Sequence, residues 1–479
     1  MISKLIDIVG SENISNDPEV LQTYSRDLYS SLLSPKGKPD CVIMPKEIEE
    51  LTQIMKFANK NKVPVIPRSS GLDLHGDSIP IFGGLMIDLS TMNRIIDICP
   101  TALEGVFSRV EPGVTFFQLY KELKKVNMRA LLPARLSAST TPASTYFNRN
   151  VLFSSAKHGY TGDWVILSHE IILPTGEILR TGNLTLPNSG GTMPHSHGSD
   201  LGRILMGSLG TTGIVTKVTI KIKDEPEERK IFFLTSENLA ELLKAVKSIL
   251  RYSPIEIGEE HITMNKLCLA SLLASNSRDF DNLNNMLPTW VHILALTGKK
   301  DWVDCQEKDL MDAAQPTALK PTAELEGIEK APEEFSDEFS NPMRIERTFQ
   351  YLPYNHIEFY TAPSKIHEFE EGIRTITSKT GYSKDLGICI VPIEQSRTYY
   401  VEYDLYFDPS NTEEMNQVKE TYKLAYTYLI NNGALINTPH DYFVAEQLYS
   451  KMQVYYETML KIKKLIDPND IMHPGKLFL

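Results

Sequence analysis

The hydrophobic positions of the first 220 residues change their period several times, which predicts alternating strands and helices. Short apolar runs predict strands at 40–44, 63–66, 85–89 and 106–110. Between the first two runs, apolar residues at helical spacing behind an acidic first turn predict a helix over 45–62. A second helix is predicted over 115–126, a hairpin over 171–180 and a half-buried strand over 218–222. The order predicts a compact βαβ unit followed by further strands.

A charged segment at 223–230 marks the first change of composition. After it, longer helical patterns mix with aromatic strands predicted at 357–360 and 398–407. The stretch between 298 and 342 is rich in Glu, Asp, Lys and Pro, which favours a solvated surface excursion over a partner-binding segment. Helical spacing returns at the end of the chain. We therefore expect three parts, namely 1–222, 223–445 and 446–479.

Composition and charge then exclude several functional classes. The 479 residues carry 49 Lys and Arg against 61 Asp and Glu, a formal net charge of −12, whereas a nucleic-acid binder usually has a basic surplus. No apolar run is long enough for a signal peptide or a membrane span. The five cysteines are scattered, so no disulfide framework, zinc site or iron–sulfur site is predicted. We expect a soluble cytoplasmic protein and leave homodimerisation open.

Two glycine-containing segments are candidates for binding a phosphate. The first, PRSSGLDLHG at 67–76, directly follows a predicted strand, and its small residues let successive N–H groups point at one anion. A pyrophosphate is the natural occupant of such a nest. The second, GSLGTTGIVT at 207–216, precedes a strand rather than a helix and so lacks the Rossmann arrangement. His195 and His197 have no third ligand nearby in the sequence, and we interpret them as loop residues; no metal site is predicted.

In this order and spacing, the segments resemble the FAD-binding domain of the vanillyl-alcohol oxidase / p-cresol methylhydroxylase family. The resemblance is also carried by VEPGVTFFQLY at 110–120, HGYTGDW at 158–164, DLGRILMGS at 200–208 and DPNDIMHPGK at 467–476. It implies an α+β fold, in which a two-subdomain FAD-binding domain of the p-cresol methylhydroxylase type carries a cap domain with an antiparallel sheet. The chain is also similar to glycolate-oxidase-like D-2-hydroxy-acid dehydrogenases, although their His-x-Gly-Asp-Gly-Asn-x-His signature is not found.

The resemblance implies a set of FAD-binding residues. The pyrophosphate would be wrapped by Pro67, Arg68, Ser69, Ser70, Gly71, Leu72 and Asp73. The flavin and ribityl side would be lined by Pro133, Ser139, Thr140, Ala143, Ser144, Asn148 and Arg149. The adenine end would be held by Gly210, Thr211, Gly213, Ile214 and Val215, and Lys476 would fold back onto this domain. Many relatives carry Gly-Gly-Asn where this chain has Ala143-Ser144-Thr145, a departure that affects how closely the backbone approaches the flavin ring.

Candidate catalytic residues come from both large parts of the chain. His75 follows the first loop, aligns with an active-site tyrosine of the aryl-alcohol branch, and can exchange protons near pH 7. Arg397 and Tyr399 fall on the strand that faces the flavin in relatives. His440 and Tyr442 lie in the region where vanillyl-alcohol oxidase carries a catalytic Tyr-Arg pair. A structural role for each of them is an open alternative.

These features predict an FAD-dependent oxidoreductase that transfers a hydride from a small alcohol, phenolic or hydroxylated substrate to the flavin. Three alternatives stay open: a D-2-hydroxy-acid dehydrogenase, a redox-neutral flavin-dependent transferase and a non-catalytic flavin binder. The electron acceptor is left open among oxygen, a quinone, a cytochrome and a flavoprotein. No nucleic-acid partner is expected.

FAD is predicted to be bound without a covalent link. Relatives that tether the flavin through a loop histidine carry it at the position of Leu72, which has no nucleophilic atom. The tether of the aryl-alcohol branch aligns with Arg397 or Thr398, and neither side chain suits that linkage. After performic-acid treatment and a denaturing gel, all flavin fluorescence should run at the dye front. A fluorescent band that travels with the polypeptide would contradict this prediction.

Overall fold

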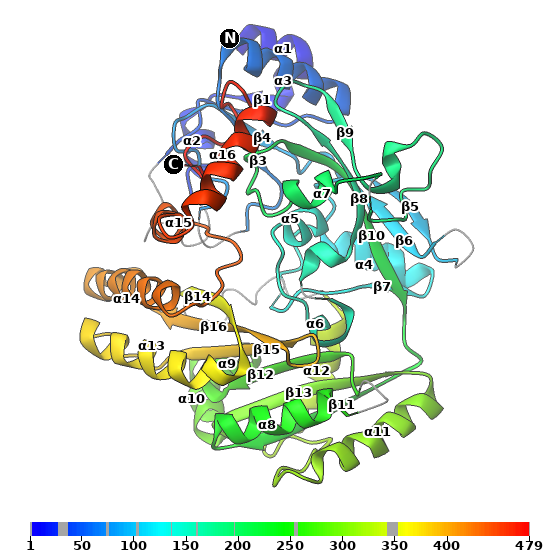
Figure 1. Ribbon diagram of the computed structural model, residues 1–479, viewed down its shortest axis with the longest axis vertical. Coiled ribbons are helices and arrows are strands. Elements are labelled where there is room, and N and C mark those ends of the chain that lie inside the picture. The colour runs from blue at the N-terminus through cyan, green and yellow to red at the C-terminus, as the bar shows by residue number, and fades with distance from the viewer. Residues whose placement is uncertain are drawn as a thin grey trace.

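The first sheet forms around the predicted βαβ unit. The computed structural model describes residues 2–26, 37–72, 76–101, 105–135, 137–159, 161–195, 197–252, 257–342 and 353–478 (Figure 1). The strands of this sheet lie in the order β1 (Ile14–Ser15), β2 (Cys41–Ile43), β4 (Leu85–Asp88) and β3 (Val65–Arg68). β2 and β3 each pair in parallel with β4, so the strand predicted at 85–89 lies between the two strands of the βαβ unit.

Helices cover both faces of this small sheet. α3 (Ile48–Asn61) buries the apolar stripe Leu51, Ile54, Met55 and Ala58, and α1 (Ile2–Val9) adds Leu5 and Val9 to the same core. α2 (Pro18–Thr23) packs Leu21 with Val42 and Ile66, in a separate core cluster. Because each loop after a parallel strand leaves the sheet at the same edge, the loop after β3 lies at an edge suited to ligand binding.

The second sheet is antiparallel and is organised by one long strand. β10 (Ile214–Asp224) pairs with β6 (Phe107–Val110), β8 (Ile166–Ile172) and β7 (Met128–Ala130), while β5 (Ile95–Cys99) and β9 (Ile178–Arg180) lie at the edges. The predicted strand at 218–222 is longer in the structure because it has these three partners. The helices of this part are α4 (Phe116–Lys125), α5 (Pro142–Phe147), α6 (Ser155–His158) and α7 (Leu201–Leu205).

The third sheet forms the cap and pairs antiparallel throughout. Its strands lie in the order β11 (Glu228–Ser236), β13 (Trp290–Gly298), β12 (Glu260–Asn265), β15 (Gly387–Ile393), β16 (Thr398–Tyr406) and β14 (Tyr354–Thr361). One face is covered by α8 (Leu239–Leu250), α11 (Lys300–Ala314), α13 (Ile366–Thr380) and α14 (Thr412–Asn431), and the other face turns toward the first two sheets (Figure 1). Within the described ranges, no helix is both long and apolar enough to cross a bilayer.

The acidic stretch between 298 and 342 is not a surface excursion, so that prediction is wrong. It contains α11 and α12 (Ala331–Ser340), and α12 buries Phe335 and Phe339 in the core that joins the cap to the second sheet. Their spacing of four residues places both aromatic rings on one face of the helix, while Glu333 and Asp337 are exposed. The same core is closed by α9 (Lys266–Leu273) and α10 (Ser277–Met286).

The end of the chain returns to the first sheet. After α15 (Tyr442–Tyr449) and α16 (Gln453–Ile466), the N–H of Val65 donates to the carbonyl oxygen of Ile471, and the N–H of His473 donates to that of Val65. The buried ammonium group of Lys463 lies 2.8 Å from the carbonyl oxygen of Thr211 and also pairs with the buried carboxylate of Asp467. One side chain therefore connects α16 to the loop before β10.

We expect Lys463→Met to lower the melting temperature by about 3 °C. The substitution leaves the Asp467 carboxylate buried without its cation, at a cost of about 3 kcal/mol. Lys461, on the same helix, is exposed, and Lys461→Met is the matched control. Differential scanning calorimetry of both variants measures the difference. Equal melting temperatures would contradict the proposed connection.

Candidate active site

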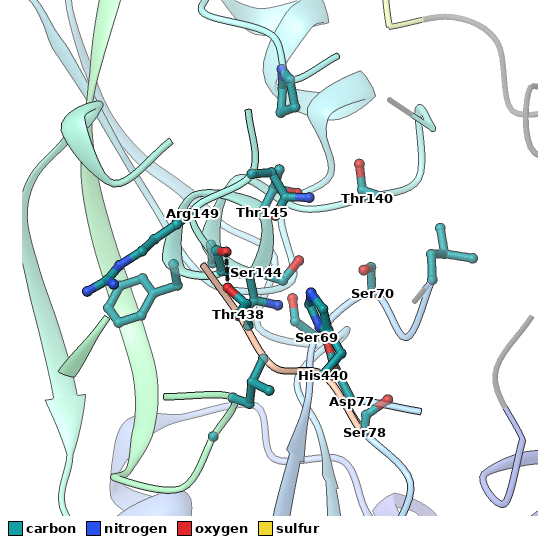
Figure 2. Close-up of a pocket in the computed structure, with 18 of the residues that line it drawn as sticks. Ser69, Ser70, Asp77, Ser78, Thr140, Ser144, Thr145, Arg149, Thr438 and His440 are labelled. Atoms are coloured by element: carbon teal, nitrogen blue, oxygen red, sulfur yellow. Dashed lines mark hydrogen bonds and ion pairs between the residues drawn. The ribbon is translucent and has the colours of Figure 1, made fainter. Parts of the chain in front are cut away.

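A cavity of about 380 Å³ lies where the loops of the first two sheets face the cap. Figure 2 shows polar side chains from both sides around it: Ser69, Ser70, Thr140 and Ser144 from the loops, and Thr438 and His440 from the segment between α14 and α15. The cavity therefore has two walls, which we call the loop wall (residues 67–72, 77–78, 133–135, 137–151 and 208–215) and the cap wall (β14, β16 and residues 437–440).

The side chain of Ser69 anchors the loop after β3 to two neighbouring segments. Ser69 Oγ lies 2.6 Å from the carbonyl oxygen of Pro112 and 2.6 Å from Thr141 Oγ1. In the described part of the chain, the N–H groups of residues 69–72 donate no hydrogen bond. Gly71 has φ +63°, which turns the chain in the way an anion nest requires. These unused donors around a cavity fit a pyrophosphate.

The second glycine loop packs directly on the first. Gly210 has φ +75°, and a Cβ atom there would lie 2.6 Å from Pro67 Cγ. α5 begins beside both loops, with the hydroxyl of Thr141 accepting from the N–H of Ser144 at its first turn. Ala143, Ser144 and Thr145, where many relatives carry Gly-Gly-Asn, all line the cavity. At this point of the loop wall, the cavity is therefore lined by side chains where many relatives have glycines.

Most of the predicted cofactor-binding residues meet at this cavity. Its lining includes Pro67, Arg68, Ser69, Ser70, Gly71, Leu72, Pro133, Ser139, Thr140, Ala143, Ser144, Asn148, Arg149, Gly210, Gly213 and Val215. Three others do not line it: Thr211 donates its hydroxyl to the Ser208 carbonyl, Ile214 lies in the core below α3, and Lys476 lies behind the wall on Gly76 and Asp77. Asp73 and His75 lie outside the described residues.

Sequence comparison agrees with this geometry. A family model described as an FAD binding domain matches residues 39–182. The chain is 25% identical to the glycolate oxidase subunit GlcD of Bacillus subtilis, over 99% of this chain and 96% of that relative. It is 23% identical to a mitochondrial D-lactate dehydrogenase (cytochrome) of Arabidopsis thaliana, over 92% of this chain and 73% of the relative.

Among solved structures, substrate-bound p-cresol methylhydroxylase matches with a TM-score of 0.85 at 19% identity, covering 100% of this chain and 96% of that one. This likeness confirms the predicted fold class. Residues 39–182 therefore match an FAD binding domain, and the whole chain shares the fold of p-cresol methylhydroxylase. FAD is its cofactor, as predicted.

The cap wall of this FAD-linked oxidase is lined by alternate residues of two strands. Tyr354, His356, Glu358 and Tyr360 of β14 reach the cavity, as do Tyr400 and Glu402 of β16. The hydroxyl oxygen of Tyr400 lies 2.8 Å from Glu358 Oε2 and 2.6 Å from Glu402 Oε2. Its single proton can be donated to one of these carboxylates at a time. Arg135, from the loop wall, binds Glu402 and Asp404. Sequence reasoning missed all of these residues. The alternation of polar and apolar positions along β14 could have indicated the residues of that strand.

His440 joins the two walls. Its Nδ1 lies 2.7 Å from Asp77 Oδ2, and its Nε2 lies 3.2 Å from Glu358 Oε1. Burial alone would disfavour the charge, but the two carboxylates outweigh burial and raise the pKa of His440 well above its usual value. The imidazole is therefore a cation at neutral pH, and Lys476 Nζ lies 3.1 Å from the other oxygen of Asp77.

The structure places three catalytic candidates away from the cavity. The side chain of Arg397 is 69% exposed and pairs with Glu394. Tyr399 is buried under the cap helices and donates to Ser396 Oγ, because odd-numbered residues of β16 face the helices rather than the cavity. Tyr442 is 52% exposed at the start of α15. Of the described candidates, His440 reaches the cavity. Among the described residues, no cluster of three His, Cys, Asp or Glu side chains is arranged to hold a metal ion.

Gly71→Val should raise the dissociation constant of FAD by about tenfold or more, equivalent to about 1.4 kcal/mol. A side chain is strained at this positive φ, and its Cβ would lie 2.1 Å from Arg68 Nε, so the loop would have to shift. Gly198→Val is the matched control, because Gly198 also has a positive φ but has open space around it. Fluorescence titration of the apoprotein with FAD compares the two variants. Wild-type affinity in Gly71→Val would show that this loop does not hold the cofactor.

Proposed function

We propose that this FAD-linked oxidase oxidises a hydroxyl-bearing carbon of a small substrate that lies between the loop wall and the cap wall. The observation that carries the proposal is the contrast between these walls: one offers unused backbone donors for the cofactor, and the other offers ionisable side chains for a polar substrate. Bound FAD supplies the acceptor for the hydride. A base for the hydroxyl proton and a group for the substrate oxygen must come from the protein.

The loop wall supports the placement of FAD. The N–H groups of residues 69–72 would hold the pyrophosphate, and Ser144 lines the cavity beside Thr438 of the cap wall (Figure 2). Thr438 donates to the carbonyl oxygen of Asn148 at 3.3 Å, which keeps the cap segment against this loop. The ring end of the cofactor would then face β14 and β16.

His440 would hold the substrate oxygen. Its imidazolium is fixed between Asp77 and Glu358 and lies on the lining of the cavity. A fixed cation stabilises negative charge that develops on an oxygen as its proton and hydride leave. This role makes His440 an electrostatic group rather than a base, because the carboxylates keep it protonated.

A small 2-hydroxy acid is a second candidate substrate. The relatives that match over most of this chain are named glycolate oxidase and D-lactate dehydrogenase, which supports this class. The same imidazolium could then bind the carboxylate of the substrate. Lactate and glycolate therefore belong in the test beside neutral alcohols and phenols.

The test is anaerobic reduction of the FAD-loaded protein by a panel of primary alcohols, alkylphenols, lactate and glycolate, followed by the loss of flavin absorbance. We expect at least one class to bleach the flavin, and His440→Gln to slow its reduction by about 10²-fold with FAD content unchanged. His367→Gln is the control, because His367 is exposed on α13 and pairs with Glu371. The proposed function would be contradicted if dithionite reduces the flavin but no compound of the panel does.

A further inference from the structure

Two acidic side chains of the cap wall, Glu358 and Glu402, meet at the hydroxyl of Tyr400, and a third, Asp404, shares Arg135 with Glu402. Glu402 and Asp404 occupy alternate positions of β16, so both side chains lie on the face away from the cap helices. Both bind Arg135 Nη1, at 2.9 Å for Asp404 Oδ1 and in a shorter contact for Glu402 Oε1. The second oxygen of Glu402 lies 2.6 Å from the hydroxyl of Tyr400, whose oxygen also lies 2.8 Å from Glu358.

The number of available protons limits how these contacts can form. A phenol has one proton and can donate it to one carboxylate at a time, so Tyr400 cannot satisfy Glu358 and Glu402 together. Two neighbouring buried carboxylates also resist full ionisation, because each charge raises the cost of the other. Asp404 is fully buried, and burial, opposed by Arg135 and assisted by Glu402, raises its pKa to about 6. A proton shared within this cluster satisfies the contacts.

Among these acids, Glu402 is the one suited to receive a proton from a substrate. It lines the cavity, whereas Asp404 does not. Glu358 also lines the cavity, but it holds the imidazolium of His440 and its side chain is 23% exposed, against 10% for Glu402. Glu402 also has a second acid beside it, Asp404, with which a received proton can be shared.

We propose that Glu402 is the catalytic base, and that Asp404 and Tyr400 are positioning residues that share its proton. This inference rests on the proposed oxidation of a hydroxyl-bearing carbon. In the step, the C–H bond breaks and its electron pair leaves with hydrogen as a hydride to FAD. The O–H bond of the substrate breaks, its proton forms a bond to a Glu402 oxygen, and the C–O bond becomes C=O.

The groups that face Glu402 come from five elements. They are Arg135 from the loop wall, Tyr400 and Asp404 of β16, Glu358 and Tyr354 of β14, Cys268 of α9 and Cys389 of β15. Burial raises the pKa values of both thiols, so they stay protonated in the neutral range. Of these groups, Asp404 has a pKa of about 6, which makes Asp404 the expected source of titration there.

The kinetic test is stopped-flow reduction of the FAD-loaded protein by the substrate that bleaches it fastest. We expect the wild-type rate to fall as the pH drops through about 6, because a proton taken up at Asp404, whose pKa is about 6, is shared with the neighbouring Glu402 and blocks the acceptor. Glu402→Gln should lower the rate about 10²-fold or more and remove the fall in rate at low pH, with FAD content unchanged. Asp404→Asn should move the fall in rate to lower pH. Glu402→Asp should recover part of the rate that Glu402→Gln loses. Glu370→Gln, on the helix-covered side of the cap, is the control.

Infrared pH-difference spectra test the shared proton without any substrate. The wild-type protein should show a carboxylic-acid band that titrates near pH 6, and Glu402→Gln and Asp404→Asn should each remove it. Absence of the band in the wild type, or a Glu402→Gln rate within threefold of wild type with an unchanged pH profile, would overturn the inference. If the band is present but no panel compound reduces the flavin, the proposed function fails together with the role of Glu402 as base.

Discussion

One buried imidazolium, that of His440, holds the two walls of the active site together. A cation buried this deeply is stable only if carboxylates surround it, and here one carboxylate comes from each wall: Asp77 from the loop side and Glu358 from the cap. Removing either partner would leave an uncompensated charge, so the two halves of the molecule are coupled by the cost of separating them. The cavity persists at their junction because this polar bridge replaces direct apolar packing there.

Beside this bridge and the ion pairs of Arg129 and Arg135 with cap carboxylates, an apolar core sets the distance between the walls. A single hydrophobic cluster runs from the second sheet, through Phe153, to Phe335 and Phe339 of α12 and on to the inner face of the cap sheet. Close packing of such a core resists small displacements. The charged bridge therefore works within a fixed frame, which is the condition for electrostatic groups to act without rearranging.

Local pattern in the sequence accounts for the loop wall. The βαβ unit follows from the change between strand and helix periods, and α3 forms with the predicted boundaries to within a few residues. The two glycine segments indicated a phosphate nest, and the cofactor they predicted is the one the family binds. These features depend on contacts between residues close in the sequence, which is why one sequence sufficed to find them.

The cap wall could not be found in the same way. β16 is buried on both faces, so tyrosines occupy both its odd and even positions, and the pattern does not show which face meets the cavity. The prediction chose Tyr399 rather than Tyr400, a shift of one residue that moves a side chain to the opposite face. Arg135 meets Glu402 across 267 positions, and nothing local in the sequence specifies that pair. The helix α12 was missed for a related reason, because its acidic surface hides the two phenylalanines that it buries.

The most direct test of this account is a crystal structure of the FAD-loaded protein with a hydroxylated substrate or its product. The account predicts the pyrophosphate on the N–H groups of residues 69–72, and the substrate oxygen within hydrogen-bond distance of both His440 and Glu402. A pyrophosphate bound elsewhere, or a substrate oxygen that contacts neither residue, would contradict it.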